Sequence, residues 1–478
     1  MTDSDGKARL DPDLSNRLSR DAEAIRRWIY AVAVVQFDID HGPIIECVYP
    51  EGILSDHLTY IIQMTSIPDS SKANLGDRLF TIRIATEDLF AIVCFRQIPD
   101  STASRGYFQK SFVILSKLPL IELWESIISV LAPIYFEHGL ISVIEAAAHN
   151  WSGWPDPLSA RGIIQLPFLG QVISVNVEEN LHTQTNSFYG SFTHIKIYDT
   201  FRSCLDRLWT LWELTMKGAP LLIIADNPTA STNIVLGLIS LISPSFVYHA
   251  DYRPYFTLSD PDYRGYLTMC NHSRLPGCIL GATSIFFLDS LVDFPNVLRL
   301  DEASDPVLIT EYKPQIRCDK EFLRALDCCN DKNAELRQYF SSLTASFMRS
   351  FDSMFKPVPY VPRKEGLSPL KRYIPSKKRI SALMLDIIEG PNFLPWFDCK
   401  RTKTLSDIDA RMDAAIIAAD MDEITDCLSL SEAESMMREI KRRRNCPRTK
   451  ARPALIAALD QHYEIVQDVI SRLNYSYS

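Results

Sequence analysis

The most constraining feature of this sequence is an alternation of strand-like runs and helical patterns between residues 200 and 301. The strand-like runs are Leu221–Ala225, Tyr255–Leu258, Cys278–Leu280 and Val297–Leu300, and the helical patterns are Phe201–Trp212, Ser231–Ser243 and Ile285–Leu291. Strands that are apolar on both faces are typical of parallel sheets with helices on each side. We therefore expect a three-layer α/β/α domain with a mostly parallel sheet.

The preceding segment has the pattern of an antiparallel sheet with helices. Its strand-like runs are Ile29–Phe37, Pro43–Tyr49, Leu79–Ile84, Phe90–Arg96 and Tyr107–Leu115, and helical spacing occurs at Leu54–Ile62, Leu120–Tyr135 and Ile141–Ala148. Such runs predict about five strands with helices against one sheet face, which is an α+β module. Pro155 and Pro157 lie in the break that follows, and this break indicates a domain boundary.

Beyond about residue 315 the strand-like runs stop. The helical patterns there are Phe322–Phe355, Ile380–Ile388, Leu405–Arg444 and Ala454–Leu473. A chain of 478 residues is expected to form about three domains. The fold class that we predict is therefore multi-domain α/β plus all-α, with a flexible tail at 1–25 and modules at 26–155, 156–314 and 315–478.

Composition narrows the classes of partner. The net charge of -9 argues against a nucleic-acid binder, which needs a basic face to neutralise phosphates. Eleven cysteines without regular spacing, and a charged start with Asp3, Asp5, Lys7 and Arg9, favour a reducing, cytoplasmic compartment. The longest apolar stretches are shorter than the roughly 18 to 20 residues that span a bilayer, so any membrane contact should be peripheral.

Motifs for covalent chemistry or cofactor binding are missing from the sequence. The apolar run Leu221–Ala225 is followed by Asp226–Ser231, which has no glycine and begins with an acidic residue, so a phosphate-binding loop is disfavoured. Cys270, His272 and Cys278 form the densest group of possible metal ligands, but they lack a second spaced pair. We expect no catalytic residue, metal or cofactor.

One basic run follows a helical pattern: Lys441, Arg442, Arg443 and Arg444. Cations are favourable at a helix C-terminus, so one interpretation is a solvated helix end. The other interpretation is contact with anionic membrane lipid, worth about 1 kcal/mol per basic residue near the surface.

Several long phrases resemble a known family. In the central region they are Leu211-Trp212-Glu213-Leu214, Ile242-Ser243-Pro244 and Asp251-Tyr252-Arg253-Pro254-Tyr255-Phe256-Thr257. In the first region they include Ile67-Pro68-Asp69-Ser70, Leu75-Gly76-Asp77, Gly106-Tyr107-Phe108-Gln109-Lys110-Ser111 and Ser116-Lys117-Leu118-Pro119, and the helical region adds Gly390-Pro391-Asn392-Phe393. These phrases resemble the DENN domain-containing protein 6 subgroup of DENN-domain exchange factors, over about residues 28 to 400.

The resemblance implies a tripartite DENN architecture: an upstream longin-like module, a central α/β module and a downstream helical module. It also implies guanine-nucleotide exchange on a Rab-family GTPase, by a cytoplasmic protein that is recruited to recycling endosomes. An exchange factor needs no acid, base or nucleophile, because it binds the nucleotide-free GTPase more tightly than the loaded form. The alternative is a scaffold that tethers a small GTPase at polarised membrane sites without promoting exchange.

By similarity to the family, the GTPase is expected in the cleft between the first and central modules. Asp69, Asp77 and Arg78 are placed on an exposed loop of the first module, and Asp251 and Arg253 precede a predicted central strand. We predict that these five residues bind the GTPase. The other interpretation of the same residues is turn capping and an internal ion pair.

Overall fold

The structure is a computed structural model, which describes residues 26–69, 75–101, 106–139, 153–182, 187–272, 275–301, 305–351, 381–425, 428–447 and 452–476, with positions 142, 143, 147, 150, 151 and 449. The chain divides into two compact units, Met1–Trp396 and Phe397–Ser478. The tail predicted at 1–25 lies outside the described residues, and the predicted module boundaries stay predictions.

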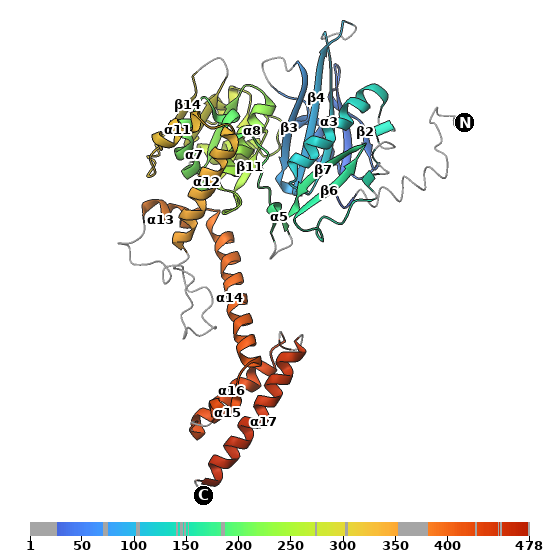
Figure 1. The fold of residues 1–478 in the computed structure, drawn as a ribbon. Helices are drawn as coiled ribbons and strands as arrows, with labels where there is room; N and C mark the ends of the chain where they lie inside the picture. The colour runs from blue at the N-terminus through green and yellow to red at the C-terminus, as the bar shows by residue number, and fades with distance from the viewer. Residues whose placement is uncertain are drawn as a thin grey trace, which may run out of the picture. The chain divides into compact units, whose positions relative to one another are not determined.

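A five-stranded antiparallel sheet forms the first part of the first unit (Figure 1). Its strands are β1 (Ala31–Asp38), β2 (Gly42–Tyr49), β3 (Gly76–Ile84), β4 (Leu89–Pro99) and β5 (Tyr107–Ser116), in the order β2-β1-β5-β4-β3. All four neighbouring pairs are antiparallel. The five predicted strands are confirmed, and β3 lies at an edge of the sheet.

Helices cover both faces of this sheet. Helix α2 (Asp56–Thr65) begins where the Ser55 side chain accepts a hydrogen bond from the Leu58 backbone N–H, and its Leu58, Ile61 and Ile62 join one core cluster with the sheet. Helix α3 (Ile121–His138) packs on the other face, where the rings of Phe112 and Tyr135 are 5.4 Å apart. The expectation of helices on one face is therefore wrong, because alternate side chains of these strands are apolar on both sides.

The second sheet of this unit is mostly parallel, as predicted. Its strands are β10 (Leu221–Ala225), β11 (Asp251–Arg253), β12 (Cys278–Ala282), β13 (Asn296–Leu300) and β14 (Val307–Thr310), in the order β11-β12-β10-β13-β14. The pairs β11–β12, β12–β10 and β10–β13 are parallel, and β14 adds an antiparallel edge.

Helices lie on both faces of the second sheet. Helix α8 (Pro228–Ile242) packs so closely on one face that a Cβ atom at Gly281 of β12 would lie 2.4 Å from Ser231 Oγ. On the other face, α9 (Tyr263–Asn271) and α10 (Phe286–Ser290) contribute Tyr266, Cys270 and Phe287 to a buried cluster with Leu222 and Leu280. This arrangement gives the three layers that the alternating pattern predicts.

One predicted strand of this sheet is wrong. Residues Tyr255–Leu258 are not a strand, and the edge strand beside β12 is β11, which begins four residues earlier in the chain. Tyr255 belongs to the core cluster of the first sheet and Phe256 to that of the second, so the aromatic run that looks like a strand is shared between two cores.

Short elements connect the two sheets and lead into β10. They are β6 (Ile163–Phe168), β7 (Gln171–Asn176), α5 (Val177–Asn180), β8 (Leu181–His182), β9 (Ser187–Phe188), α6 (Ile197–Phe201), η2 (Leu205–Arg207) and α7 (Leu208–Lys217). A further short helix, η1 (Ala85–Glu87), lies between β3 and β4. Strands β6 and β7 form a separate antiparallel hairpin, and so do β8 and β9.

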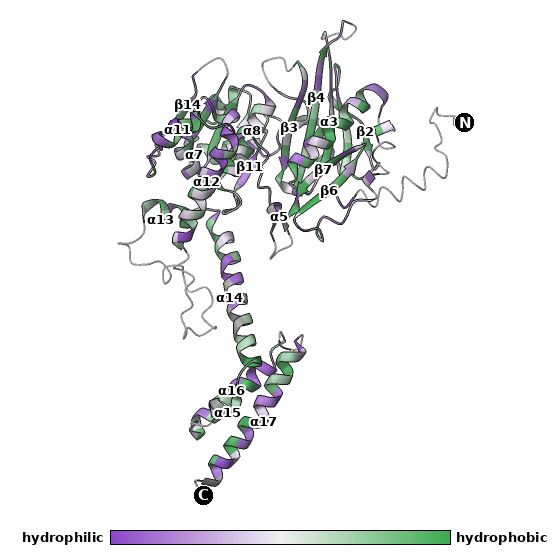
Figure 2. Ribbon diagram, in the orientation of Figure 1, coloured by the Kyte–Doolittle hydropathy of each residue, from purple (hydrophilic) through white to green (hydrophobic). Residues whose placement is uncertain are grey.

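After β14 the described elements are helices. They are α11 (Lys320–Asp327), α12 (Lys332–Arg349), α13 (Ala382–Glu389), α14 (Phe393–Ile417), α15 (Met421–Thr425), α16 (Leu430–Arg444) and α17 (Pro453–Ser476). Figure 2 shows hydrophilic and hydrophobic residues alternating along α16 and α17, which bury Met437, Ile440, Leu459 and Val466 together. Within the described part of the chain, no helix combines the length and apolar character needed to cross a membrane.

Candidate functional site

The two sheets of the first unit meet along a packed contact that we call the seam. On one side is β3, and on the other are α8, β11 and residues 255–258 (Figure 1). The Thr81 backbone N–H donates to Thr232 Oγ1 at 3.1 Å, in a buried environment. The rings of Phe80 and Tyr255 meet edge to face at 5.0 Å. The seam therefore joins the two sheets by core packing rather than by surface polar contacts alone.

Asp69 joins the loop before β3 to the second sheet. Its carboxylate accepts hydrogen bonds from the Tyr255 hydroxyl at 2.9 Å, the Leu258 backbone N–H at 3.1 Å and the Thr283 hydroxyl at 3.5 Å. Burial raises the pKa of Asp69, and these hydrogen bonds oppose that rise. The predicted site residue Asp69 thus links the loop before β3 to Tyr255, Leu258 and Thr283.

Asp251 and Arg253 lie in a buried charge network at the other end of the seam. Asp251 accepts from Arg83 Nη1 at 2.9 Å, from Arg253 Nε at 2.9 Å and from the Tyr266 hydroxyl at 2.7 Å. The side chain of Arg253 is 6% exposed and also pairs with Asp262 at 2.5 Å. Both charges are therefore engaged within the chain, which agrees with the internal ion pair that the sequence left open.

Burial alone would disfavour the charge on Arg253. The carboxylates of Asp251 and Asp260 outweigh this effect, so the pKa of Arg253 is raised. Burial also raises the pKa of Asp260 to about 6, although the nearby Arg253 acts in the opposite direction. A buried charge of this kind is stable only while its partners remain, so the network fixes the local geometry of β11.

Asp77 and Arg78 lie at the beginning of β3, beyond the seam. The Asp77 carboxylate accepts two hydrogen bonds from Arg96, at 2.6 Å and 2.7 Å, and the Arg96 guanidinium lies 4.2 Å from the centre of the Phe136 ring. Arg78 Nε is buried and has no hydrogen-bond partner among the described residues. The prediction that Asp77 and Arg78 lie on an exposed loop is therefore wrong, because both residues belong to strand β3 and pair with β4.

Exposed apolar side chains follow β11 and β12 in the chain, close in sequence to residues that bind Asp69. Leu258, whose N–H binds Asp69, is 37% exposed, and Ile285 and Phe286, which follow Thr283 closely in the chain, are 60% and 50% exposed. We call Leu258, Ile285 and Phe286 the carboxyl-edge patch. The carboxyl ends of parallel strands are where open α/β sheets bind ligands.

Sequence reasoning missed this patch as a functional surface. Ile285 and Phe286 fitted the apolar face of the helix predicted over Ile285–Leu291, and only Phe287 and Leu291 prove to be buried. The available signal was two adjacent large apolar residues directly after a strand, where one of them cannot face the core.

The residues considered above as a possible phosphate-binding loop and a possible metal site have structural roles instead. At the N-terminus of α8, the Asn227 side chain accepts a hydrogen bond from the Ala230 N–H at 2.9 Å and caps the helix. Cys270 and Cys278 are buried in the core cluster, and His272 Nδ1 is 2.7 Å from the Thr268 carbonyl oxygen. In the described part of the chain, no three His, Cys, Asp or Glu residues gather as metal ligands.

The basic run ends α16 in the second unit, as the sequence predicts. Arg442 and Arg443 both bind the Glu439 carboxylate, at 2.6 Å and 2.8 Å. Arg444 pairs with Asp460 at 2.6 Å, and Lys441 Nζ lies 5.4 Å from the centre of the Tyr463 ring. Two arginines thus share one carboxylate, which leaves a local excess of positive charge.

Comparison with known proteins gives a consistent set of relatives. A family model described as transport protein Avl9 matches residues 29–247. Protein DENND6A of Mus musculus is 27% identical over 489 residues, which cover 82% of this chain and 80% of the relative. The protein DENND6 homolog of Dictyostelium discoideum is 25% identical over an alignment that covers 92% of this chain and 79% of the relative. Protein DENND6B of Homo sapiens is 28% identical over an alignment that covers 75% of this chain and 73% of the relative.

Proposed function

Because this chain belongs to the DENND6 type of DENN proteins, we propose that it is a guanine-nucleotide exchange factor. In this proposal it promotes GDP release from a Rab-family GTPase in endosomal recycling traffic. It acts in the cytoplasm and is recruited to recycling endosomes. The proposal extends the family relationship to a specific activity, partner and place.

The proposed architecture is the tripartite one. Residues 26–155 would form the upstream longin-like module, 156–314 the central module and 315–478 the downstream helical module. The antiparallel sheet β1–β5, the mixed sheet β10–β14 and the helices from α11 onward support this division.

The mechanism that we propose is linkage between two ligands of the GTPase. A protein that binds the nucleotide-free GTPase more tightly than the loaded form must, by reciprocity, weaken nucleotide binding. In practice such a partner holds the switch segments away from the phosphate and Mg²⁺. This activity requires a rigid surface built from more than one element, and it requires no catalytic group.

One observation supports this most directly: Asp69 ties the loop before β3 to both Tyr255 and the Leu258 backbone. This link sets residues of the first sheet beside the carboxyl-edge patch. A partner bound there would touch both modules at once, and the packed seam would keep the two surfaces in a fixed relation. Exposed apolar residues with a polar rim are typical of the centre of a protein interface.

The five predicted residues would then act in two ways. We propose that Asp77 and Arg78, at the start of β3, contact the GTPase. Asp69, Asp251 and Arg253 would act as positioning residues, since their polar atoms bind groups of this chain across or beside the seam.

The test is release of labelled GDP from a panel of Rab GTPases, with a matched pair of variants. Ile285→Asp places a charge in the carboxyl-edge patch, and Ile309→Asp places one on β14, where the isoleucine is 61% exposed against 60% at Ile285. Loss of one central apolar contact should slow release by about tenfold or more, a typical loss at an interface centre. Ile309→Asp should match the wild-type rate.

The outcomes separate the proposals. Equal rates for Ile285→Asp and the wild type would contradict the patch as the GTPase surface. Acceleration of no Rab in the panel would contradict exchange activity. If a GTPase is bound without faster release, the chain is instead a scaffold that tethers the GTPase at polarised membrane sites.

For recruitment we propose that Lys441, Arg442, Arg443 and Arg444 contact anionic lipid. The shared use of Glu439 by two arginines supports this, because the run keeps a net positive charge after its internal pairs are formed. Flotation with liposomes that contain phosphatidylserine should fall when Lys441 and Arg442 are replaced by Gln. Unchanged flotation would rule the contact out.

A further inference from the structure

Strand β14 is an open edge of the second sheet. It pairs with β13 on one side, and no other described strand pairs with it. The opposite edge strand, β11, differs, because Arg83 of β3 binds its Asp251 from across the seam. An open edge carries backbone N–H and C=O groups without partners, which can pair with a further strand. In the described part of this sheet, β14 is therefore the edge at which another strand can add.

The exposure of side chains alternates strictly from Asp305 to Lys313, a segment that contains β14. Every odd-numbered residue in this segment is exposed, and every even-numbered residue is half-buried. This two-residue period is that of an extended strand with one face in solvent. Ile309 is 61% exposed and Val307 is 43% exposed. Large exposed apolar residues on an open edge strand favour association with another strand.

The two ends of the segment carry opposite charges. Asp305 and Lys313 are exposed, and neither forms an ion pair with a described residue. Ile309 is at the midpoint between them in the sequence. In an antiparallel pair of two identical segments centred on Ile309, Asp305 of each copy therefore lies opposite Lys313 of the other copy. Opposite charges at facing positions of an antiparallel pair are stabilising.

Charge also distinguishes this register from a neighbouring one. A pair centred on Leu308 would place Asp305 of each copy opposite Glu311 of the other. Like charges directly opposite each other destabilise a strand pair. The charges of the segment therefore favour the register centred on Ile309.

We propose that two copies of this chain associate through β14, as an antiparallel pair of strands about a two-fold axis at Ile309. Asp305 of each copy pairs with Lys313 of the other, and the two Ile309 side chains face each other between these ion pairs. A two-fold contact uses the same surface of both copies, so the assembly closes as a dimer. The two second sheets become one continuous sheet.

This inference does not depend on the proposed exchange activity. The carboxyl-edge patch follows β11 and β12 in the chain, whereas β14 is at the other edge of the sheet. Ile309→Asp should therefore remove the dimer, because two carboxylates would face each other at the axis, and should still match the wild-type rate of GDP release.

The test is sedimentation velocity of the full-length protein over a range of concentrations. Asp305→Lys and Lys313→Asp should each raise the dimer dissociation constant roughly tenfold or more, because each variant replaces two exposed ion pairs with like-charge contacts. An equimolar mixture of the two variants should form mixed dimers with about the wild-type dissociation constant. In such a dimer each copy supplies the charge that the other copy requires.

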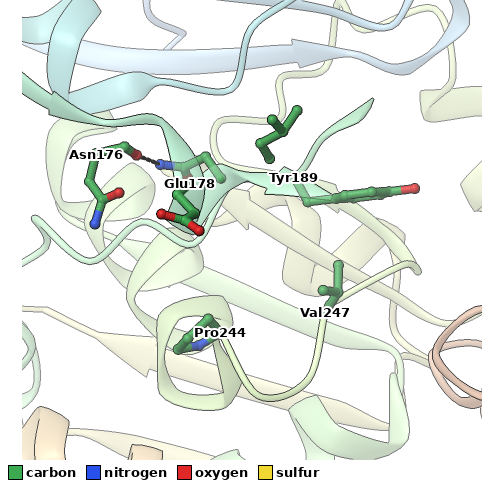
Figure 3. Close-up of a pocket in the computed structure, with 7 residues that line it drawn as sticks. Asn176, Glu178, Tyr189, Pro244 and Val247 are labelled. Atoms are coloured by element: carbon green, nitrogen blue, oxygen red, sulfur yellow. Dashed lines mark hydrogen bonds between the residues drawn. The ribbon is translucent and has the colours of Figure 1, made fainter. Parts of the chain in front are cut away.

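Glu178→Lys is the matched control. Glu178 is also an exposed carboxylate, but it belongs to α5 and lines a hollow of about 420 Å³ with Tyr189, Pro244 and Val247 (Figure 3). This variant should leave the dissociation constant unchanged.

Three results would overturn the proposal. The first is a wild-type protein that stays monomeric at every concentration. The second is a dimer that Asp305→Lys weakens no more than Glu178→Lys does, because the copies would then meet at another surface. The third is a mixture of Asp305→Lys and Lys313→Asp that stays monomeric, because the two charges would then not face each other between copies.

Discussion

The hydroxyl of Tyr255 donates a hydrogen bond to the carboxylate of Asp69 at 2.9 Å, although the two residues are 186 positions apart in the sequence. The Tyr255 ring is also packed edge to face on Phe80 of β3. One buried side chain therefore contributes an apolar and a polar contact to the same seam.

Tyr255→Phe should lower the free energy of unfolding by about 1 to 2 kcal/mol, because the variant keeps the ring contact and leaves Asp69 with one donor fewer. Urea unfolding followed by tryptophan fluorescence measures this. Tyr60→Phe is the control, since Tyr60 is 51% exposed and should change stability little. If Tyr255 positions the GTPase surface as proposed, the same variant should also slow GDP release.

Two glycine-to-alanine substitutions should change the stability of the protein in opposite directions. In Gly281→Ala the new Cβ would lie 2.4 Å from Ser231 Oγ and 2.6 Å from the Pro254 carbonyl oxygen, so overpacking should destabilise the protein by about 1 to 3 kcal/mol. Gly265 of α9 has no atom within 4 Å of its Cβ position. Gly265→Ala should therefore stabilise it by roughly 0.5 to 1 kcal/mol, as alanine does in helices. Thermal melting of each variant measures the difference, and equal shifts in melting temperature would contradict the close contact at Gly281.

Asn392 is fully buried, and its side chain is engaged at both ends. Its Oδ1 accepts hydrogen bonds from the backbone N–H groups of His249 and Ala250, at 2.7 Å and 2.9 Å. Its Nδ2 donates to the Thr215 and Met216 carbonyl oxygens, at 3.1 Å and 3.4 Å. The amide therefore holds the start of α14 against the segment before β10 and the segment before β11.

Asn392→Ala should destabilise the first unit by about 3 kcal/mol, since buried backbone groups would lose their partner. Asn330→Ala, at an exposed position before α12, should be nearly neutral. Urea unfolding of both variants measures the difference. A small loss for Asn392→Ala would mean that water or a neighbouring side chain replaces the amide.

Stability should depend on pH through Glu125 and His194, whose side chains lie 3.8 Å apart. Burial, helped by the charge of Glu122, raises the pKa of Glu125 to about 7 from its ordinary value of 4.5. The contribution of Glu125 to stability is therefore full below about pH 4.5 and is lost as the pH rises through 7.

His194 has the opposite dependence. Burial, helped by the charge of Arg337, lowers its pKa to about 4 from 6.5. The contribution of His194 is therefore full above about pH 6.5 and is lost as the pH falls through 4. Glu125→Gln should specifically flatten the loss of stability between pH 5 and 8, as measured by urea unfolding at each pH. An unchanged slope for this variant would contradict the raised pKa of Glu125.

The local patterns predicted much of the secondary structure. The first five strands are confirmed, because short runs of β-branched and aromatic residues between turns fit the pleated, partly buried surface of a sheet. The strand at Tyr255–Leu258 was wrong for a tertiary reason. Asp251 and Arg253 look like loop residues, yet they form β11 because their backbone pairs with β12. Arg83 and Asp262 pair with their charges in this position.

The candidate site was predictable only in part. The residue phrases indicated the family. Asp69 and Asp251 both lie along the seam, and their predicted role in binding a GTPase stays a prediction. Their partners Tyr255 and Arg83 could not be assigned, because hydrogen bonds between residues more than 150 positions apart leave no periodic pattern. The carboxyl-edge patch was missed for a similar reason, since exposure depends on which neighbours cover a side chain.

The sequence by itself determined most of the element types, the mostly parallel character of the central sheet and the family, because these follow from local patterning and ordered phrases. Only the tertiary structure decided which charges are neutralised within the chain and which apolar residues stay exposed. The physical reason is that burial and pairing depend on long-range neighbours. Whether Arg253 is a buried ion-pair partner or a free surface cation is decided by Asp251, Asp260 and Asp262 as they lie in the folded chain.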